Sequence, residues 1–151
     1  MKRIIKHSIL YLIFATSSII ISCPEHKDSN NKDAIVVIET EDGLENLLKN
    51  NEGPCLISFF MDKCGWCKKM HPIIENLAND DQFYHITFYS VNGPLLKAAE
   101  KVKEILNILI TGYPTMLFIN RGEVVDKQIG GANQEAMIQK LNKSLPDTSA
   151  L

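Results

Sequence analysis

The sequence has neither an excess of positive charge nor a long hydrophobic run. Its 151 residues carry 16 Lys plus Arg against 18 Asp plus Glu, a formal net charge of −2. Nucleic-acid-binding domains usually show a basic patch or a basic overall balance, so nucleic acid is not an expected partner. The main apolar stretch, residues 8–21, is shorter than the roughly 20 residues that a membrane-spanning helix needs.

Cysteine and histidine are also sparse, with four of each in the chain. Cys64, Cys67 and His71 have the spacing of a zinc half-site, but a closed tetrahedral site needs a fourth ligand. Cys55 or His85 would have to supply that ligand, so zinc is the lesser alternative. A c-type haem site needs histidine directly after the second cysteine, where this chain has lysine, and haem is therefore excluded. We predict no metal and no cofactor.

The first 33 residues have the pattern of an export signal followed by a tether. Three basic residues precede the apolar run at 8–21, as in a secretory signal. The run ends in Ile-Ile-Ser-Cys, which resembles a bacterial lipobox, in which the chain is cleaved before the cysteine and that cysteine is lipidated. We predict residues 1–22 as a lipoprotein-type signal peptide, Cys23 as the lipidated residue and 23–33 as a polar, flexible tether. An ordinary cleaved signal or an uncleaved anchor are alternatives that would also export the domain.

The remaining chain alternates between strand and helix patterns, and its 45% hydrophobic and 23% charged residues are ordinary for one globular domain. A parallel beginning followed by a hairpin implies a mixed, twisted sheet with helices on both faces. We predict a single α/β domain over 34–146, with 147–151 as a disordered tail. The expected strands are 34–38, 55–60, 85–91, 114–120 and 123–129, and the expected helices are 41–51, 64–77, 94–109 and 133–145.

The segment 59–72, FFMDKCGWCKKMHP, holds the two cysteines best placed for chemistry. Cys64 and Cys67 stand where an apolar strand pattern gives way to a helical one. A thiol in the first turn of a helix faces unpaired backbone N–H groups and the positive end of the helix dipole, and both favour the thiolate. Cys64 is the predicted reactive thiol and Cys67 its more sheltered partner. A purely structural disulfide is the alternative, although so short a loop constrains the unfolded chain little.

The motif CGWC at 64–67, after an apolar strand, resembles the active-site segment of the thioredoxin superfamily. GYPT at 112–115, followed by MLFINRGEVV, resembles the cis-proline loop and hairpin of that family, and Pro72 matches a proline common in its active-site helix. The resemblance covers most of residues 35–145. It implies a thioredoxin-like three-layer fold with a mixed central sheet, and thiol–disulfide exchange in which Cys64 attacks and Cys67 resolves.

The resemblance also implies a substrate-binding surface beside the two cysteines. Pro114 is expected to be cis, so that the backbone of Tyr113 faces the active site and pairs with an extended substrate; a trans proline at the start of an edge strand is the alternative. Trp66 is expected to be exposed, either as an apolar contact for the partner or packed on a neighbouring loop.

Several positions depart from the family pattern. Ser58 stands where thioredoxin has a buried aspartate that moves protons to and from the second cysteine. Without that acid, deprotonation of Cys67 relies on water or on another group, and Asp62 is a candidate only if its side chain turns inward. His71, one helical turn after Cys67, either tunes that thiol or is an ordinary solvated residue. Cys55 is expected to be a small apolar core residue, with a regulatory thiol as the alternative.

The sequence thus predicts an exported thiol–disulfide oxidoreductase, favoured in the reductase or isomerase direction because no helical insertion typical of the disulfide-oxidising branch fits between Cys67 and Pro114. Its expected partners are proteins with disulfides or dithiols, a membrane or periplasmic electron donor, and the membrane itself through the lipid on Cys23. The expected location is the periplasmic face of a bacterial membrane. The alternatives are a non-enzymatic binding module that presents Trp66 and the loop at Tyr113, and a dedicated reductant in cytochrome c maturation.

Overall fold

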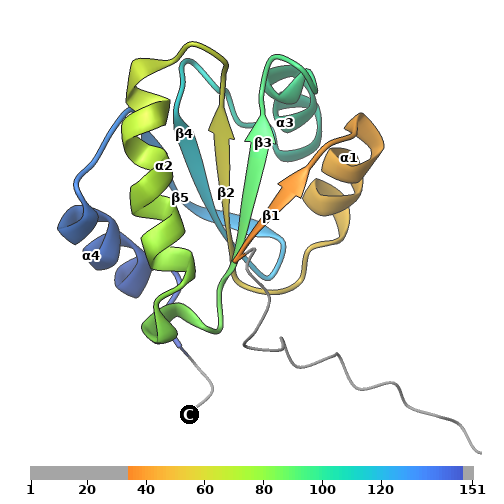
Figure 1. Cartoon of the computed structure of the whole chain (residues 1–151). Coiled ribbons are helices and arrows are strands. Elements are labelled where there is room, and N and C mark those ends of the chain that lie inside the picture. The colour runs from red at the N-terminus through yellow and green to blue at the C-terminus, as the bar shows by residue number, and fades with distance from the viewer. Residues whose placement is uncertain (1–33, 148–151) are drawn as a thin grey trace, which may run out of the picture. The chain divides into compact units, whose positions relative to one another are not determined.

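The computed structural model describes residues 34–147, which form a five-stranded sheet between two pairs of helices (Figure 1). The predictions for residues 1–33, including the signal peptide, the tether and Cys23, and for residues 148–151 lie outside this range. No helix within 34–147 is long and apolar enough to cross a bilayer. The elements in chain order are β1 Ile35–Ile38, α1 Glu41–Asn50, β2 Cys55–Phe60, α2 Gly65–Ala78, the 3-10 helix η1 Asp81–Phe83, β3 Thr87–Asn92, α3 Ala98–Leu106, β4 Thr115–Asn120, β5 Glu123–Ile129 and α4 Gln134–Ser144.

The sheet has the strand order β1-β3-β2-β4-β5 and is mixed, as predicted. β1 and β2 both pair with β3 in parallel, whereas β4 is antiparallel to β2 and β5 is antiparallel to β4. The hairpin between β4 and β5 turns at Arg121 and Gly122, which have φ values of 52° and 77°. Two consecutive residues with positive φ are typical of the tight turns whose twist matches that of paired strands.

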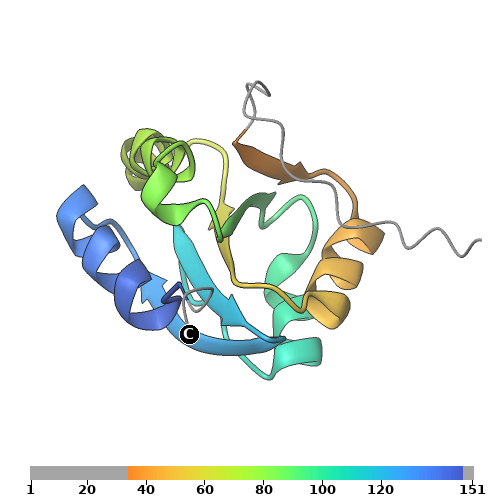
Figure 2. The same cartoon turned by 90° about the horizontal axis from the view of Figure 1, so that it is seen from below.

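The helices cover both faces of the sheet, so the predicted three-layer arrangement is confirmed. α1 and α3 lie on one face, and α2 and α4 lie on the other, as the view along the sheet shows (Figure 2). Alternate residues of β2 enter the two cores: Ile57 and Phe59 pack with α1 and α3, while Leu56 packs with α2 and α4. β2 is therefore a central strand with apolar cover on both sides, which explains its nearly continuous apolar sequence.

Three details of the secondary structure differ from the sequence-based expectation. The helix predicted over 94–109 is shorter, because Lys97 and Asn107 have φ values of 49° and 55° and so bracket α3 at Ala98–Leu106. A left-handed backbone cannot continue a right-handed helix. The 3-10 helix η1 was not predicted, and β3 begins two residues later than expected, at Thr87.

Candidate functional site

The site lies where β2 ends and α2 begins, at one end of the central strand. β2 stops at Phe60, and a short loop leads to Cys64, the residue that caps the N-terminus of α2. Within this loop Lys63 has a φ of 62°, a left-handed conformation that reverses the chain into the helix. Cys64 thereby stands at the N-terminal end of α2, as the sequence predicts.

Cys64 and Cys67 form a disulfide, with their Cα atoms 5.2 Å apart. The backbone N–H of Cys67 donates a hydrogen bond to Sγ of Cys64 at 3.1 Å, so an otherwise unpaired donor of the first helical turn points at this sulfur. Cys64 is half-buried, whereas only 8% of Cys67 is exposed. An incoming group therefore reaches Cys64 more readily than Cys67.

The loop before β4 faces the disulfide from the other side. The peptide bond between Tyr113 and Pro114 is cis, which confirms the predicted geometry. The carbonyl oxygen of Tyr113 lies 3.7 Å from Sγ of Cys64. The hydroxyl of Thr115 donates to the carbonyl of Gly112 at 2.7 Å and closes the loop on itself. A backbone segment is thus held beside the more accessible sulfur.

Trp66 combines exposure with packing on a neighbouring loop. Its side chain is 60% exposed, and Nζ of Lys69 lies 4.6 Å from the ring centroid. The ring rests on Gly131, where an added Cβ would lie only 2.6 Å from Cε3 of Trp66. The packing alternative is therefore confirmed, and contact between the exposed part of the ring and a partner stays a prediction.

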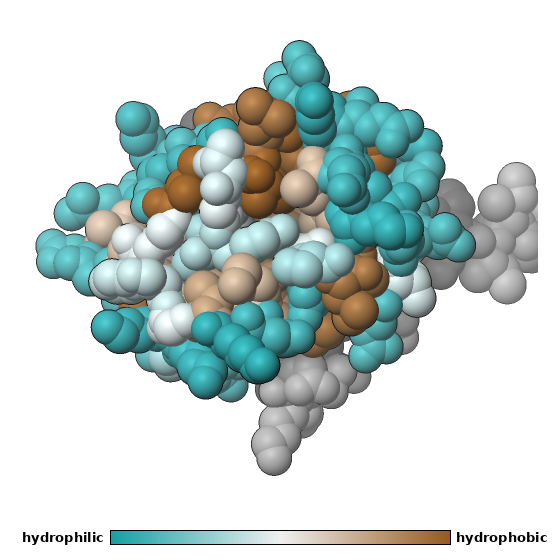
Figure 3. Space-filling model, turned by 90° about the horizontal axis from the view of Figure 1, so that it is seen from above, coloured by the Kyte–Doolittle hydropathy of each residue, from teal (hydrophilic) through white to brown (hydrophobic). Residues whose placement is uncertain are grey.

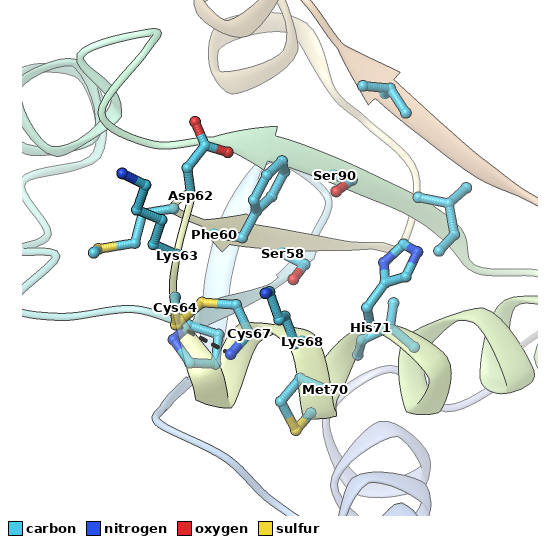
Figure 4. Close-up of a pocket in the computed structure, with 15 residues that line it drawn as sticks. Ser58, Phe60, Asp62, Lys63, Cys64, Cys67, Lys68, Met70, His71 and Ser90 are labelled. Carbon is cyan, nitrogen blue, oxygen red and sulfur yellow. Dashed lines mark hydrogen bonds between the residues drawn. A yellow bond between two sulfur atoms is a disulfide. The ribbon is translucent and has the colours of Figure 1, made fainter.

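A cavity of about 450 Å³, here called the α2–β1 cavity, opens beside the disulfide between α2 and the strands β1, β3 and β2 (Figure 4). Ser58 and Ser90, which are direct cross-strand neighbours, both line it. His71 reaches it from α2, so this residue and Cys67 share one space. The full lining is Ile35, Val37, Ser58, Phe60, Met61, Asp62, Lys63, Cys64, Cys67, Lys68, Met70, His71, Ile74, Ser90 and Pro114.

Among residues 34–147, Asp62 supplies the one carboxylate in the lining of the cavity that Cys67 shares. Asp62 is exposed, and its Oδ1 accepts a hydrogen bond of 3.3 Å from Nδ2 of Asn92. Figure 4 shows its carboxylate turned away from the disulfide. The condition under which Asp62 would serve the second cysteine is therefore not met, and Ser58 lines the same cavity as the pair.

The model of the family described as Thioredoxin matches residues 35–143 of this chain. The chain belongs to the thioredoxin family. A thioredoxin of Chlorobaculum thiosulfatiphilum is 27% identical over 110 residues, which cover 70% of this chain and 93% of that protein. The crystal structure of a Malassezia sympodialis thioredoxin superposes with a TM-score of 0.60 at 22% identity, covering 73% of this chain and 90% of that one.

Longer relatives share only this domain. Protein disulfide-isomerase A5 of Mus musculus is 29% identical over 121 residues, which cover 80% of this chain but 22% of the mouse protein. Thioredoxin homologues are disulfide oxidoreductases, and this chain is a thioredoxin-family redox protein with a Cys64–Cys67 pair able to form a disulfide.

Other candidate residues of this thioredoxin-family protein lie apart from the redox pair. Cys55 is fully buried in the α1–α3 core, and burial raises the pKa of its thiol to about 12. It is the apolar core residue that the sequence predicts. Nε2 of His85 lies 3.0 Å from the carbonyl oxygen of Leu145, near the opposite end of the domain. Within residues 34–147 no three His, Cys, Asp or Glu side chains gather into a set of metal ligands.

Sequence reasoning missed the contacts that hold the site in place. Gly93 supports the Tyr113 ring, Gly131 supports Trp66, and Ser90 pairs with Ser58 across the sheet. A cysteine, a histidine or an aromatic residue suggests a functional role from its side chain alone. The role of a glycine depends on the residues that pack against it. The pairing register of β2 and β3 places Ser90 at the site, because it sets this residue opposite Ser58.

Proposed function

We propose that this protein is an exported thiol–disulfide oxidoreductase that works on disulfides of other proteins, in the reductase or isomerase direction. One observation supports the exchange chemistry: the accessible Cys64 caps a helix, faces the loop that contains the cis peptide bond, and is paired with a sheltered Cys67. An accessible nucleophile and a sheltered resolving thiol are what a two-step exchange requires.

In the reductive direction, the Cys64 thiolate attacks one sulfur of a client disulfide, forming a mixed disulfide and releasing the first client thiolate, which takes a proton from water. The Cys67 thiolate then attacks Sγ of Cys64, the mixed disulfide breaks, and the second client thiol leaves. Two electrons pass from the cysteine pair to the client. The Cys67 N–H that points at Sγ of Cys64 stabilises negative charge on that sulfur. In isomerisation, a client thiol attacks the mixed disulfide in place of Cys67.

The proposed location follows from the sequence pattern of residues 1–23. An anchor at Cys23 would hold the domain on the periplasmic face of a bacterial membrane. There a membrane or periplasmic electron donor would reduce the Cys64–Cys67 disulfide after each turnover. Metabolic labelling with a radioactive fatty acid tests this part, with Cys23→Ser as the matched control. Label in the parent protein that is lost in the variant supports the anchor, and an unlabelled parent protein contradicts it.

The decisive experiment for the activity is a redox titration of the purified protein against glutathione and dithiothreitol buffers, with alkylation and peptide mass spectrometry as the readout. We expect one reversible two-electron transition that involves Cys64 and Cys67. Cys55 is the internal control, because its pKa of about 12 and its burial keep it unlabelled in the folded protein.

A low, thioredoxin-like potential supports a reductase, and a high one supports an isomerase or an oxidase. Cys67→Ser should accumulate mixed disulfides between Cys64 and clients, which the double variant Cys64→Ser/Cys67→Ser should not. If no reversible transition is found, the proposed enzyme activity is wrong, and a binding module that uses the same surface becomes the proposed function.

A further inference from the structure

The walls of the α2–β1 cavity are mainly apolar and include side chains that water reaches. Ile35 and Val37 of β1 form one side, and Ile74 of α2 forms part of the other. Val37 is 60% exposed although it belongs to the sheet. The surface view of this end of the molecule shows brown apolar areas interrupted by teal polar side chains (Figure 3). An apolar side chain from outside can therefore enter the cavity and lose contact with water.

Two lysines and one aspartate give the mouth of the cavity a net positive charge. Lys63 and Lys68 both line it, and neither forms an ion pair with any residue of the described domain 34–147. Asp62 is the one carboxylate in the lining, and its Oδ1 accepts a hydrogen bond from Asn92. His71 also lines the cavity.

Some lysines elsewhere in the domain form ion pairs. Lys97 and Lys101 pair with Glu41, and Lys140 pairs with Asp126. The whole chain is slightly acidic, with a net charge of −2. Lys63 and Lys68 therefore place two cations without ion pairs beside the disulfide, which favours a partner with negative charge at the same place.

The part of the cavity between Cys64 and His71 limits how many residues of a partner lie near the disulfide. Cys64 and His71 are seven residues apart on the helix, or roughly 10 Å at a rise of 1.5 Å per residue. An extended chain rises about 3.3 Å per residue, so the same distance corresponds to about three residues. A client segment bound along this part of the cavity therefore contacts it with about three residues next to the client cysteine.

We propose that the α2–β1 cavity binds an extended client segment in which an apolar residue and an acidic residue lie within about three positions of the cysteine under attack. The apolar side chain packs against Val37, and the carboxylate faces Lys63 and Lys68. This inference rests on the proposed function, because it names the class of protein whose disulfide Cys64 reduces.

Synthetic cystine peptides test the proposal with the purified, fully reduced protein. Each peptide is a disulfide-linked dimer with symmetric flanks, so the direction of binding does not matter: Gly-Leu-Glu-Cys-Glu-Leu-Gly, and versions in which both Glu are Gln, both Glu are Lys, or both Leu are Gly. The single-turnover rate is followed by quenching with acid and separating the oxidised protein. Ratios between peptides are compared, since a change in Cys64 reactivity alters all rates alike and cancels.

At low salt we expect the Glu peptide to react about two- to threefold faster than the Gln peptide for each lysine it meets, as two unit charges roughly 8 Å apart in water imply. The advantage should fall towards unity at 1 M salt. Lys63→Gln and Lys68→Gln should each reduce the ratio, whereas Lys103→Gln, which removes an exposed charge of α3, should not. Val37→Ser should reduce the ratio of the Leu to the Gly peptide, which we expect to be about three- to tenfold, and leave the charge ratio unchanged.

The two proposals fail in different ways. If no peptide is reduced, the redox function is wrong. If all four peptides are reduced at the same rate, or if Lys103→Gln lowers the charge ratio as much as Lys63→Gln does, the redox function stands and the cavity does not select this class of client.

Discussion

Gly93 is the position where a single added methyl group should disturb the site most directly. It is buried at the end of β3, and an alanine Cβ there would overlap the end of the Tyr113 ring, with Cζ only 2.6 Å away. Carbon atoms in good contact are 3.5–4.0 Å apart, so the ring must retreat by about 1 Å. The φ of Gly93 is not in the left-handed region, and the backbone itself accepts alanine.

Gly93→Ala should therefore lower the free energy of unfolding by about 1–2 kcal/mol, the lower part of the range for overpacking, because the half-buried Tyr113 side chain can yield partly. With a urea m-value of about 1.5 kcal/mol/M, the unfolding midpoint falls by roughly 1 M. Gly53→Ala is the matched control, since a Cβ there meets nothing within 4 Å, and its midpoint should stay nearly unchanged.

A double-mutant cycle isolates the cause. In a Tyr113→Ala background the ring is gone, so the same Gly93→Ala change should cost less than about 0.5 kcal/mol. The single variant should also reduce disulfides more slowly, because the Tyr113 carbonyl lies 3.7 Å from Sγ of Cys64 and moves with its side chain. An equal cost in both backgrounds would refute the steric explanation, and so would the absence of a cost in the parent protein.

Two further changes test other contacts. Gly131→Ala should displace Trp66, whose Cε3 would lie 2.6 Å from the new Cβ. Because this ring is 60% exposed, the unfolding free energy should change by less than about 1 kcal/mol, while the emission of this sole tryptophan shifts. An unchanged emission spectrum would mean that the ring does not rest on Gly131. For Asp126, burial raises the pKa, but the Lys127 N–H, the Lys140 ammonium and the Ser144 hydroxyl together hold it below its usual 3.8. A carboxylate whose pKa is lower in the folded state stabilises that state at pH values above its pKa in the unfolded chain. This stabilisation is lost as the pH falls through the pKa of the folded state. Asp126→Asn should thus cost roughly 0.5–1 kcal/mol near pH 7, and the difference should shrink below about pH 4 in thermal unfolding measured across pH; a difference independent of pH would contradict this origin.

Local signals in the sequence account for the correctly predicted part of the fold. The helix that follows Cys64, the capping of α4 by Asn133 and the hairpin at Gly122 depend on side chains within a few residues of one another. The error at α3 has the same origin, because the apolar spacing of 94–109 continues past Lys97 and Asn107. The left-handed backbone of those two residues sets the ends of the helix, and the apolar spacing carries no sign of it.

The amino-acid sequence by itself determined the redox pair, its place at the start of a helix and the alternation of strands and helices that leads to a thioredoxin-like domain. These features rest on residue chemistry and short-range periodicity. The tertiary structure alone decided what surrounds the pair: Gly93 under Tyr113, Gly131 under Trp66, and a cavity that joins Val37 of β1 to Lys68 of α2. The physical reason is that such contacts join residues 20 to 65 positions apart, and the packing of whole layers, which no local pattern encodes, sets their distances.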